Sequence, residues 1–369
     1  MTRRIWLEIG PLQEGQYTGL SQVTAGLAAT LLGDTTRAVG FFLGRAAIPP
    51  EIVATVLTRG EGEFLSFWLA RHTPRAPATS LNETSIALFP NVKTCRRGFA
   101  IETQIVHDLS TLLTPQFHLP ETVRFHAAAM ADDVATNDLT FCVSEATRQD
   151  VLRYLCPPDP ARIITVHPGP GQPGALAPPM VPVEPFVLVL GTIEPRKNIA
   201  VILEFLAAQT QLLAGLRFVF LGRHGWGEAP ATLLARHGLN EAAEAGRILF
   251  PGYVSAAARD ALLARARLMI YPSLFEGFGL PVLEALAFGT PVLTTRSSSL
   301  PEVGGEAVTY FDPFTPEDFG RGLAEALQDR HATAETARAA RRTWAARFSW
   351  PKTWQKITAA IDNLPEAGR

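Results

Sequence analysis

The sequence predicts an α/β protein made of two similar halves, each a parallel β-sheet covered by helices on both faces. Short apolar runs bounded by turn residues alternate along the chain with longer stretches of helical periodicity, as in doubly wound sheets. Residues 168–185 interrupt this alternation with seven prolines in eighteen positions. Because proline continues neither a helix nor a central strand, this segment predicts a linker. A length of 369 residues also fits two domains.

The first half starts the strand–helix pattern at its N-terminus. Its predicted strands are short runs rich in apolar residues: Arg4–Gly10, Arg37–Gly44, Ile86–Phe89, Glu102–His107, Thr140–Ser144 and Arg162–His167. Within Leu20–Leu32, the apolar residues Leu20, Val23, Leu27 and Leu31 fall on one face and predict a helix between the first two strands. A second helix is expected over Glu145–Leu155, with Ser144 as its N-cap.

The second half repeats this architecture without repeating the sequence. Its predicted strands are Phe186–Gly191, Arg217–Gly222, Arg247–Phe250, Arg267–Tyr271, Pro291–Thr295 and Ala307–Phe311. A helix is expected from Ile199, and the tail from Pro316 is helical and ends in a last helix near Lys352–Asp362. The strands alternate with helices, so a second parallel sheet is predicted.

The predicted domain boundaries follow from these patterns. An N-terminal domain spans residues 1–170, a Pro/Gly-rich linker 171–185, and a C-terminal domain 186–345. The last segment, 346–369, leaves its own sheet, and we expect its helix to pack back on the N-terminal domain.

Composition limits the compartment and the class of partner. Thirty-three basic and 35 acidic residues leave a net charge of −2, so no overall positive field attracts the chain to nucleic acid. Cys95, Cys142 and Cys156 build neither a disulfide framework nor a metal-binding pair, which indicates free thiols in a reducing compartment. No apolar run approaches the ~18 residues of a membrane span, and Glu8 comes too early for a signal peptide. We therefore expect a cytoplasmic protein.

The segment Ser273–Thr295, SLFEGFGLPVLEALAFGTPVLTT, carries the strongest chemical signal. Glu276 precedes the glycine-rich turn Gly277–Gly279, and a helix is expected from Leu280. Glycines let a ligand approach the backbone, and a helix start supplies N–H groups with partial positive charge. Glu284 follows eight residues after Glu276, so two carboxylates could hold two hydroxyl clusters of one elongated ligand. The same spacing is compatible with carboxylates that cap the helix and face solvent.

Arg196 and Lys197 follow the first strand of the second half. Ligands of doubly wound sheets collect outside the carboxyl ends of the strands. Two adjacent cations there suit a diphosphate, because arginine offers a planar fork and lysine a point charge. Ordinary surface charge is the alternative.

These segments together resemble the retaining glycosyltransferases of family 4, which have the two-domain GT-B fold. Glu276 and Glu284 resemble the glutamates of the family's E-x7-E motif, within the run FEGFGLPVLEA. VLVLGTIEPRKN, SSLPEV at 298–303 and FSW at 348–350 resemble the mannosyltransferase-like subgroup of bacterial surface-glycan synthesis. In the first half, VHDL at 106–109 and VSEAT at 143–147 fit the same pattern. The resemblance implies two Rossmann-like domains that face a central cleft.

The resemblance assigns roles to residues of the second half. Lys197, with Arg196 beside it, matches the lysine that binds the donor diphosphate, and Thr192 stands where many members carry an arginine. Glu276 would hold hydroxyl groups of the donor sugar, and Glu284 would bind the ribose. The remaining donor-binding residues form the loop beside the nucleobase and the glycine turn: Tyr253, Val254, Gly277, Phe278, Gly279 and Leu280.

The resemblance also assigns residues of the first half. His107 ends a strand and matches the family's histidine near the donor sugar and the reacting centre, although a lone histidine is more often structural. Asp108 would orient the loop. Gly19 lies in the first strand–helix loop, where family members place glycines against phosphate and acceptor. No G-x-G-x-x-G motif occurs there, which argues against a nicotinamide dinucleotide.

The resulting hypothesis is a retaining hexosyltransferase with His107, Arg196, Lys197 and Glu276 as catalytic residues. It would move mannose from GDP-mannose to a growing glycan or lipid-linked saccharide, as in lipopolysaccharide O-antigen synthesis. We expect no metal and no cofactor, no nucleic-acid partner, and at most a weak peripheral contact with the inner face of the membrane. A non-catalytic nucleotide-sugar-binding subunit, a GT-B epimerase and a phosphorylase with pyridoxal cofactor stay open as alternatives.

Two basic clusters lie outside these motifs. Lys93, Arg96 and Arg97 suit a solvated loop, or a contact with an acceptor phosphate or a membrane surface. The arginines at 338, 341 and 342 are expected to solvate the helical tail.

Overall fold

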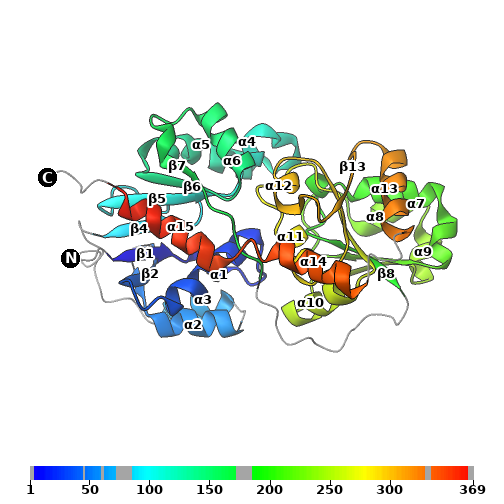
Figure 1. Ribbon diagram of the computed structural model, residues 1–369, viewed down its shortest axis with the longest axis horizontal. Helices are drawn as coiled ribbons and strands as arrows, with labels where there is room; N and C mark the ends of the chain where they lie inside the picture. Colours follow the sequence, from blue (N-terminus) through cyan, green and yellow to red (C-terminus); the bar gives the residue numbers. More distant parts are fainter. Residues whose placement is uncertain are drawn as a thin grey trace. The chain divides into compact units, whose positions relative to one another are not determined.

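The computed structural model describes residues 4–44, 46–59, 62–71, 85–171, 185–328 and 334–364. The chain forms two compact units, Met1–Gly169 with Phe348–Arg369, and Pro170–Arg347. Most of the predicted linker, residues 172–184, lies outside the described residues. Each unit contains one sheet of mainly parallel strands with helices around it, so the predicted α/β class is confirmed (Figure 1).

The sheet of unit 1 has seven strands in the order β3-β2-β1-β4-β5-β6-β7. The strands are β1 (Ile5–Glu8), β2 (Val39–Leu43), β3 (Ala46–Ile48), β4 (Ile86–Phe89), β5 (Ile101–Val106), β6 (Leu139–Cys142) and β7 (Ile163–Thr165). All six predicted strands are present, and β3 was not predicted. It pairs antiparallel with β2, because Gly44 adopts a φ of +60° and lets the chain reverse.

Helices of unit 1 surround this sheet (Figure 1). They are α1 (Gly19–Gly33), α2 (Pro50–Arg59), α3 (Gly62–Arg71), α4 (Ser110–Leu113), α5 (Pro120–Thr136), α6 (Glu145–Asp150) and α15 (Trp350–Asp362). A π-helical turn, Val151–Leu155, extends α6. Ser144 caps α6 as predicted, because its Oγ accepts a hydrogen bond from the Thr147 N–H at 3.0 Å.

The last helix, α15, packs on α1 within unit 1 (Figure 1, red beside blue). Gly26 of α1 lies directly against the Trp350 indole, where a β-carbon would collide with the ring. The Trp354 indole N–H donates to the Asp34 carboxylate at 2.7 Å. Arg37 pairs with Asp362 near the end of the helix. An apolar face and two charged contacts thus fix α15 on the first sheet's helical layer.

The sheet of unit 2 has six parallel strands in the order β10-β9-β8-β11-β12-β13. The strands are β8 (Phe186–Leu190), β9 (Arg217–Leu221), β10 (Ile248–Gly252), β11 (Leu268–Tyr271), β12 (Val292–Thr295) and β13 (Thr309–Phe311). Each lies within or close to a predicted strand. The strand order reverses between the neighbours β8 and β11, and this is the point where open α/β sheets bind ligands.

The helices of unit 2 are α7 (Ile199–Ala208), α8 (Pro230–Arg236), α9 (Asn240–Glu244), α10 (Ala256–Arg265), α11 (Leu280–Ala287), α12 (Leu300–Gly304), α13 (Pro316–Gln328) and α14 (Glu335–Ala345). Leu203 and Leu206 of α7 and Phe319 of α13 are fully buried against strand residues such as Phe218. None of the described helices is both long and apolar enough to cross a bilayer.

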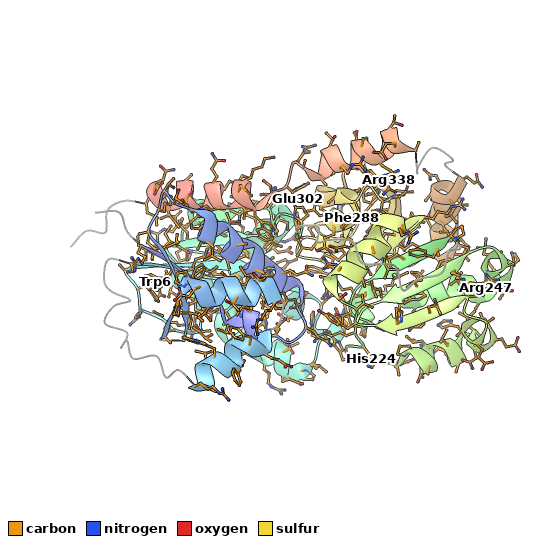
Figure 2. The ribbon with its side chains drawn as sticks, turned by 90° about the horizontal axis from the view of Figure 1, so that it is seen from below. Trp6, His224, Arg247, Phe288, Glu302 and Arg338 are labelled. Atoms are coloured by element: carbon orange, nitrogen blue, oxygen red, sulfur yellow. The ribbon has the colours of Figure 1, made fainter. Side chains whose placement is uncertain are left out.

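The arginines of α14 correct one expectation. Arg338 donates through Nη2 to the carbonyl oxygens of Ala264 and Phe288 at 3.0 and 2.9 Å, and Figure 2 shows it beside Phe288. Arg341 contacts the Gly289 carbonyl oxygen at 3.3 Å. These carbonyls lie at the C-terminal ends of α10 and α11, where cations are stabilising. The expectation that these arginines solvate the tail was therefore wrong for Arg338 and Arg341, whereas Arg342 is 39% exposed and pairs with Glu335.

Candidate functional site

The candidate site of unit 2 lies at the reversal point of its sheet. The carboxyl end of β8 leads through Gly191 and Thr192 to a 3₁₀ turn, Pro195–Lys197. The carboxyl end of β11 leads to Ser273 and the Glu276 loop. Because β8 and β11 are hydrogen-bonded neighbours, the two loops meet. The sequence analysis expected Arg196 and Lys197 at the carboxyl end of a strand, and the fold brings them together with the Glu276 loop.

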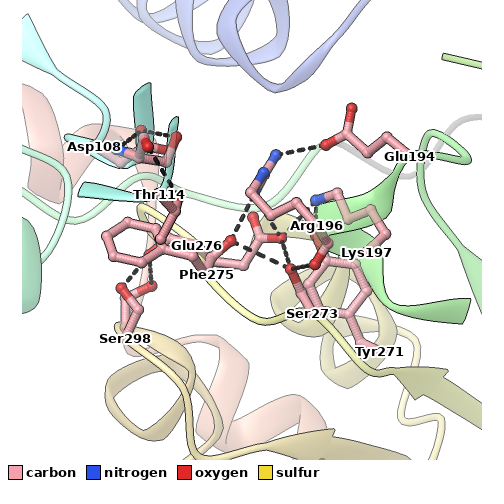
Figure 3. Close-up of polar contacts among 12 residues, drawn as sticks. Asp108, Thr114, Glu194, Arg196, Lys197, Tyr271, Ser273, Phe275, Glu276 and Ser298 are labelled. Carbon is pink, nitrogen blue, oxygen red and sulfur yellow. Dashed lines mark hydrogen bonds and ion pairs between the residues drawn. The ribbon is translucent and has the colours of Figure 1, made fainter. Parts of the chain in front are cut away.

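Glu276 is the centre of this meeting point. Its Oε1 lies 2.5 Å from Lys197 Nζ, 3.1 Å from Arg196 Nη1 and 2.5 Å from Ser273 Oγ (Figure 3). Lys197 Nζ also donates to the Tyr271 hydroxyl oxygen at 2.6 Å. Glu276 is only 7% exposed. The alternative of a helix-capping carboxylate facing solvent is therefore wrong for this residue.

Arg196 ties the two loops together. Its Nη1 donates to the Phe275 carbonyl oxygen at 2.5 Å, and its Nη2 pairs with Glu194 at 2.9 Å. The Leu274 N–H returns a hydrogen bond to the Arg196 carbonyl oxygen at 2.9 Å. With side chains 13% exposed, Arg196 and Lys197 are not ordinary surface charges.

Electrostatics favour an ionised Glu276. Burial acts to raise its pKa, but Lys197 and Arg196, with hydrogen bonds from Lys197 and Ser273, lower it to about 2. Burial raises the pKa of Glu194, and the two cations oppose that change. Two carboxylates and two cations balance each other in this cluster. The cations are thus held in place beside a helix start, as a diphosphate site requires.

The loop after Glu276 is shaped by two serines and a glycine. Ser298 and Ser299 donate from their hydroxyl groups to the Glu276 carbonyl oxygen at 2.6 and 2.9 Å. Gly279 has a φ of +102° and precedes α11 directly. A β-carbon there would lie 2.8 Å from Leu300 Cδ2, so only glycine fits. The predicted turn Gly277–Gly279 and the helix start at Leu280 are therefore present, with Phe278 buried at 4% exposure.

Glu284 lies on α11 and is 4% exposed. Arg259 of α10 approaches it, with 3.6 Å between Nη1 and Oε1. Tyr253, which is 49% exposed, and Val254 follow β10 and precede α10. Thr192 is half-buried and packs against Gly225. The predicted donor residues therefore all lie in unit 2, in its loops and on helix α11.

The predicted residues of unit 1 lie at the carboxyl ends of β1 and β5. His107 follows β5, and its Nε2 lies 2.7 Å from the Pro90 carbonyl oxygen. A carbonyl oxygen only accepts, so Nε2 carries the proton and Nδ1 is the acceptor. Asp108 accepts hydrogen bonds from the Ser110 N–H and hydroxyl group at 2.8 and 2.6 Å, which fits a loop-orienting role. Gly19 is the first residue of α1, and the space where its β-carbon would lie is open.

The basic cluster at 93–97 has a structural role. Lys93 is buried, and its Nζ pairs with Glu102 at 3.0 Å. Arg96 pairs through Nε with Asp133 at 2.7 Å. Both interpretations of this cluster, a solvated loop and a phosphate or membrane contact, were wrong for the buried Lys93, whereas the side chain of Arg96 stays 47% exposed beside its partner. Their charges hold the β4–β5 connection against β5 and α5.

Sequence reasoning missed several residues of the site. Tyr271 reads as a core residue of a buried strand, and its hydroxyl contact with Lys197 spans 74 positions of sequence. Ser298 and Ser299 were part of a recognised motif but carried no assigned role. Glu194 and Ser273 lie only two and three positions from their partners Arg196 and Glu276 but were given no role. Arg259 had no local signal, because Glu284 lies on another helix. Across the described residues, no group of three or more His, Cys, Asp or Glu could hold a metal ion.

The fold and the family-specific motifs at this site define a glycosyltransferase of the GT-B class, and the chain belongs to the family described as glycosyl transferases group 1. The profile of that family matches residues 180–343. The chain is 32% identical over 268 residues to O-antigen chain mannosyltransferase B of Escherichia coli, an alignment that covers 69% of this chain and 68% of that protein. The family predicted from the sequence is thus confirmed.

Two further comparisons are consistent with this assignment. The serotype-specific mannosyltransferase WbdA of Escherichia coli is 29% identical over 266 residues, which cover 68% of this chain and 32% of that protein. The chain thus matches about a third of WbdA. The Anabaena protein HepE, solved with UDP and glucose, superposes with a TM-score of 0.67 at 16% identity, over 99% of this chain and 100% of that chain. This likeness shows the GT-B fold that the sequence predicted.

Proposed function

We propose that this glycosyltransferase moves mannose from GDP-mannose to a hydroxyl group of a growing surface glycan, with retention of configuration at the anomeric carbon. The mannosyltransferase names of the relatives support the donor sugar and the kind of acceptor. The observation that carries the proposal is the buried Glu276 carboxylate, which forms ion pairs with Lys197 and Arg196 at the reversal point of the sheet.

The donor diphosphate would bind Lys197, Arg196 and the N–H groups at the start of α11. A diphosphate brings negative charge into a cluster that is already balanced. We infer that Lys197 turns from Glu276 toward the phosphates, and that Glu276 then accepts hydrogen bonds from hydroxyl groups of the sugar. Glu284 would take the ribose hydroxyls, with Tyr253 and Val254 beside the base, and Thr192 and Gly277–Leu280 lining the donor.

The transfer step exchanges one bond at the anomeric carbon. The bond to the diphosphate oxygen breaks with its electron pair, and the acceptor oxygen bonds to the same face. The acceptor proton passes to an oxygen of the departing diphosphate. Lys197, Arg196 and the helix start stabilise the charge that develops on that group, so no metal is needed. His107 contacts the sugar and Gly19 the acceptor or a phosphate in this proposal, which rests for these two on the family resemblance.

The test is a transfer assay with the full chain. GDP-mannose, GDP-glucose, UDP-glucose and UDP-galactose are each offered with a mannose-terminated oligosaccharide, in buffer with excess chelator. We expect an α-linked mannosyl product from α-linked GDP-mannose, identified by proton NMR, and loss of product in Glu276→Gln. A β-linked product would contradict retention, and transfer only from a UDP-sugar would contradict the donor. A requirement for added Mg²⁺ or Mn²⁺ would contradict the metal-free step.

The acceptor also defines where the protein works. We propose a lipid-linked glycan at the cytoplasmic face of the membrane. Sedimentation with vesicles that carry such a lipid, compared with plain vesicles, tests this, and equal sedimentation with both would contradict it.

A further inference from the structure

Arg259 places a cation where no motif predicted one. It lies on α10, with its side chain 20% exposed, and its guanidinium faces Glu284 of α11 across 3.6 Å. The same guanidinium donates to Asp260 Oδ1 from Nε at 3.2 Å and from Nη2 at 3.0 Å. The side chains of Glu284 and Asp260 are 5% and 3% exposed. One arginine therefore forms ion pairs with two buried carboxylates.

The Glu284 carboxylate keeps its hydrogen-bonding capacity. In the described part of the chain, no group donates a hydrogen bond to either of its oxygens, and Arg259 approaches only as an ion pair. An ionised carboxylate accepts through both oxygens, whereas a protonated one presents a donor on one side. A ligand with two neighbouring hydroxyl groups therefore binds the ionised form better.

The charge balance at Glu284 depends on Arg259. Burial raises the pKa of Glu284, Arg259 lowers it, and Asp260 raises it again. These two residues of α10 are the charged groups that face Glu284 among the described residues. Gly171 also approaches the pair and carries no charge; its β-carbon would lie 3.4 Å from Glu284 Oε1.

We propose that Arg259 is a positioning residue that keeps Glu284 ionised, so that Glu284 can accept two hydrogen bonds from the ribose hydroxyl groups of the donor. This inference rests on the proposed function, because it takes the ligand of Glu284 to be the ribose of a nucleotide. It adds the residue on which ribose recognition depends, and it predicts how that recognition varies with pH.

The experiment measures the affinity of the full chain for GDP by titration calorimetry at about pH 6 and about pH 8.5. In Arg259→Gln, loss of the cation should weaken GDP binding at both pH values. Protonation of Glu284 should add a further loss of affinity of roughly tenfold at the lower pH. Arg259→Lys keeps the charge and the profile of the wild type. Asp260→Asn removes the carboxylate that opposes ionisation of Glu284, so its GDP affinity should depend on pH no more than that of the wild type.

The control ligand is 2′-deoxy-GDP, which lacks one of the two hydroxyl groups. The extra loss of Arg259→Gln at the lower pH should shrink with this ligand. An equal loss of GDP affinity in Arg259→Gln at both pH values would overturn the inference, since Arg259 would then contribute its charge to binding without keeping Glu284 ionised. Glu284→Gln separates failure of the proposed function from failure of the inference. Unchanged GDP affinity in this variant contradicts the ribose site itself. Weaker binding of Glu284→Gln beside a wild-type profile of Arg259→Gln contradicts only the inference. Melting curves of each variant show that it is folded.

Discussion

Glu8, at the end of β1, has a buried carboxyl group that pairs with no cation among the described residues. The residue is 3% exposed, and its carboxyl group accepts a hydrogen bond from the Gly10 N–H at 2.9 Å. Burial raises the pKa of Glu8 from its ordinary value of 4.5 to about 7, against the effect of the Gly10 hydrogen bond. The folded protein therefore retains a proton that the unfolded chain releases above pH 4.5. Stability should fall as pH rises from about 4.5 to about 7.

Replacement of Glu8 by glutamine tests this pH dependence. Glutamine keeps an acceptor for the Gly10 N–H but does not ionise. The free energy of unfolding of Glu8→Gln should match the wild type below pH 4.5 and exceed it above pH 7 by up to about 3 kcal/mol. Urea unfolding across this range measures it. A constant difference at all pH values would mean that the Glu8 proton plays no part.

His107 combines a structural hydrogen bond with a proposed catalytic one. Burial lowers the pKa of His107, against the Pro90 hydrogen bond and the charge of Asp108, so the neutral ring is favoured. Nε2 donates to the Pro90 carbonyl oxygen, which leaves Nδ1 as the acceptor for the substrate. We expect His107→Ala to lower kcat by roughly ten- to a thousandfold with near-normal GDP affinity, because the contact strengthens in the transition state. Loss of the Pro90 bond should cost about 1 kcal/mol of stability.

A second substitution separates the two roles of His107. In His107→Gln, the side-chain amide N–H can donate to the Pro90 carbonyl oxygen. Its acceptor Oε1 is bonded one atom further from the backbone than Nδ1, so it does not reproduce the position of that acceptor. The melting temperature should recover and kcat should not. Recovery of both would make the histidine purely structural.

At the scale of elements, the start of α11 depends on Gly279. Alanine there would strain the backbone at a φ of +102° and press on Leu300. We expect Gly279→Ala to cost about 1–3 kcal/mol of stability and to weaken GDP binding, because the turn after Glu276 would shift. Gly238→Ala is the matched control, since it strains a φ of +67° with open space around it and lies outside the site. Equal GDP affinity in both variants would contradict the role of the turn.

The elements also show how far the sequence could predict the structure. The buried strands β8 and β11 were recognisable because parallel strands are continuous apolar runs. The short edge strand β3 was missed, because three residues after a glycine turn carry no periodicity. Local motifs located Glu276 and Lys197. Arg259 and Tyr271 escaped prediction, because their roles arise only when α10 and β11 pack beside segments distant in sequence.

At the scale of the whole molecule, the proposed site residues divide between the two units. Lys197, Glu276 and Glu284 belong to unit 2, whereas His107 and Gly19 belong to unit 1. The described contacts of the diphosphate and ribose residues all lie within unit 2. We therefore expect nucleotide affinity to respond to substitutions in unit 2, and turnover to respond to substitutions in either unit.

The most direct test of the account is the affinity of the full chain for GDP before and after Lys197→Ala. Lys197 donates at 2.5 Å to Glu276 and is held beside the start of α11, so its loss should remove a charged hydrogen bond to the diphosphate. Titration calorimetry at neutral pH should show binding weaker by at least ~1.5 kcal/mol, or about tenfold, in a variant that melts as a folded protein. Unchanged affinity for GDP would contradict the placement of the donor diphosphate at this site.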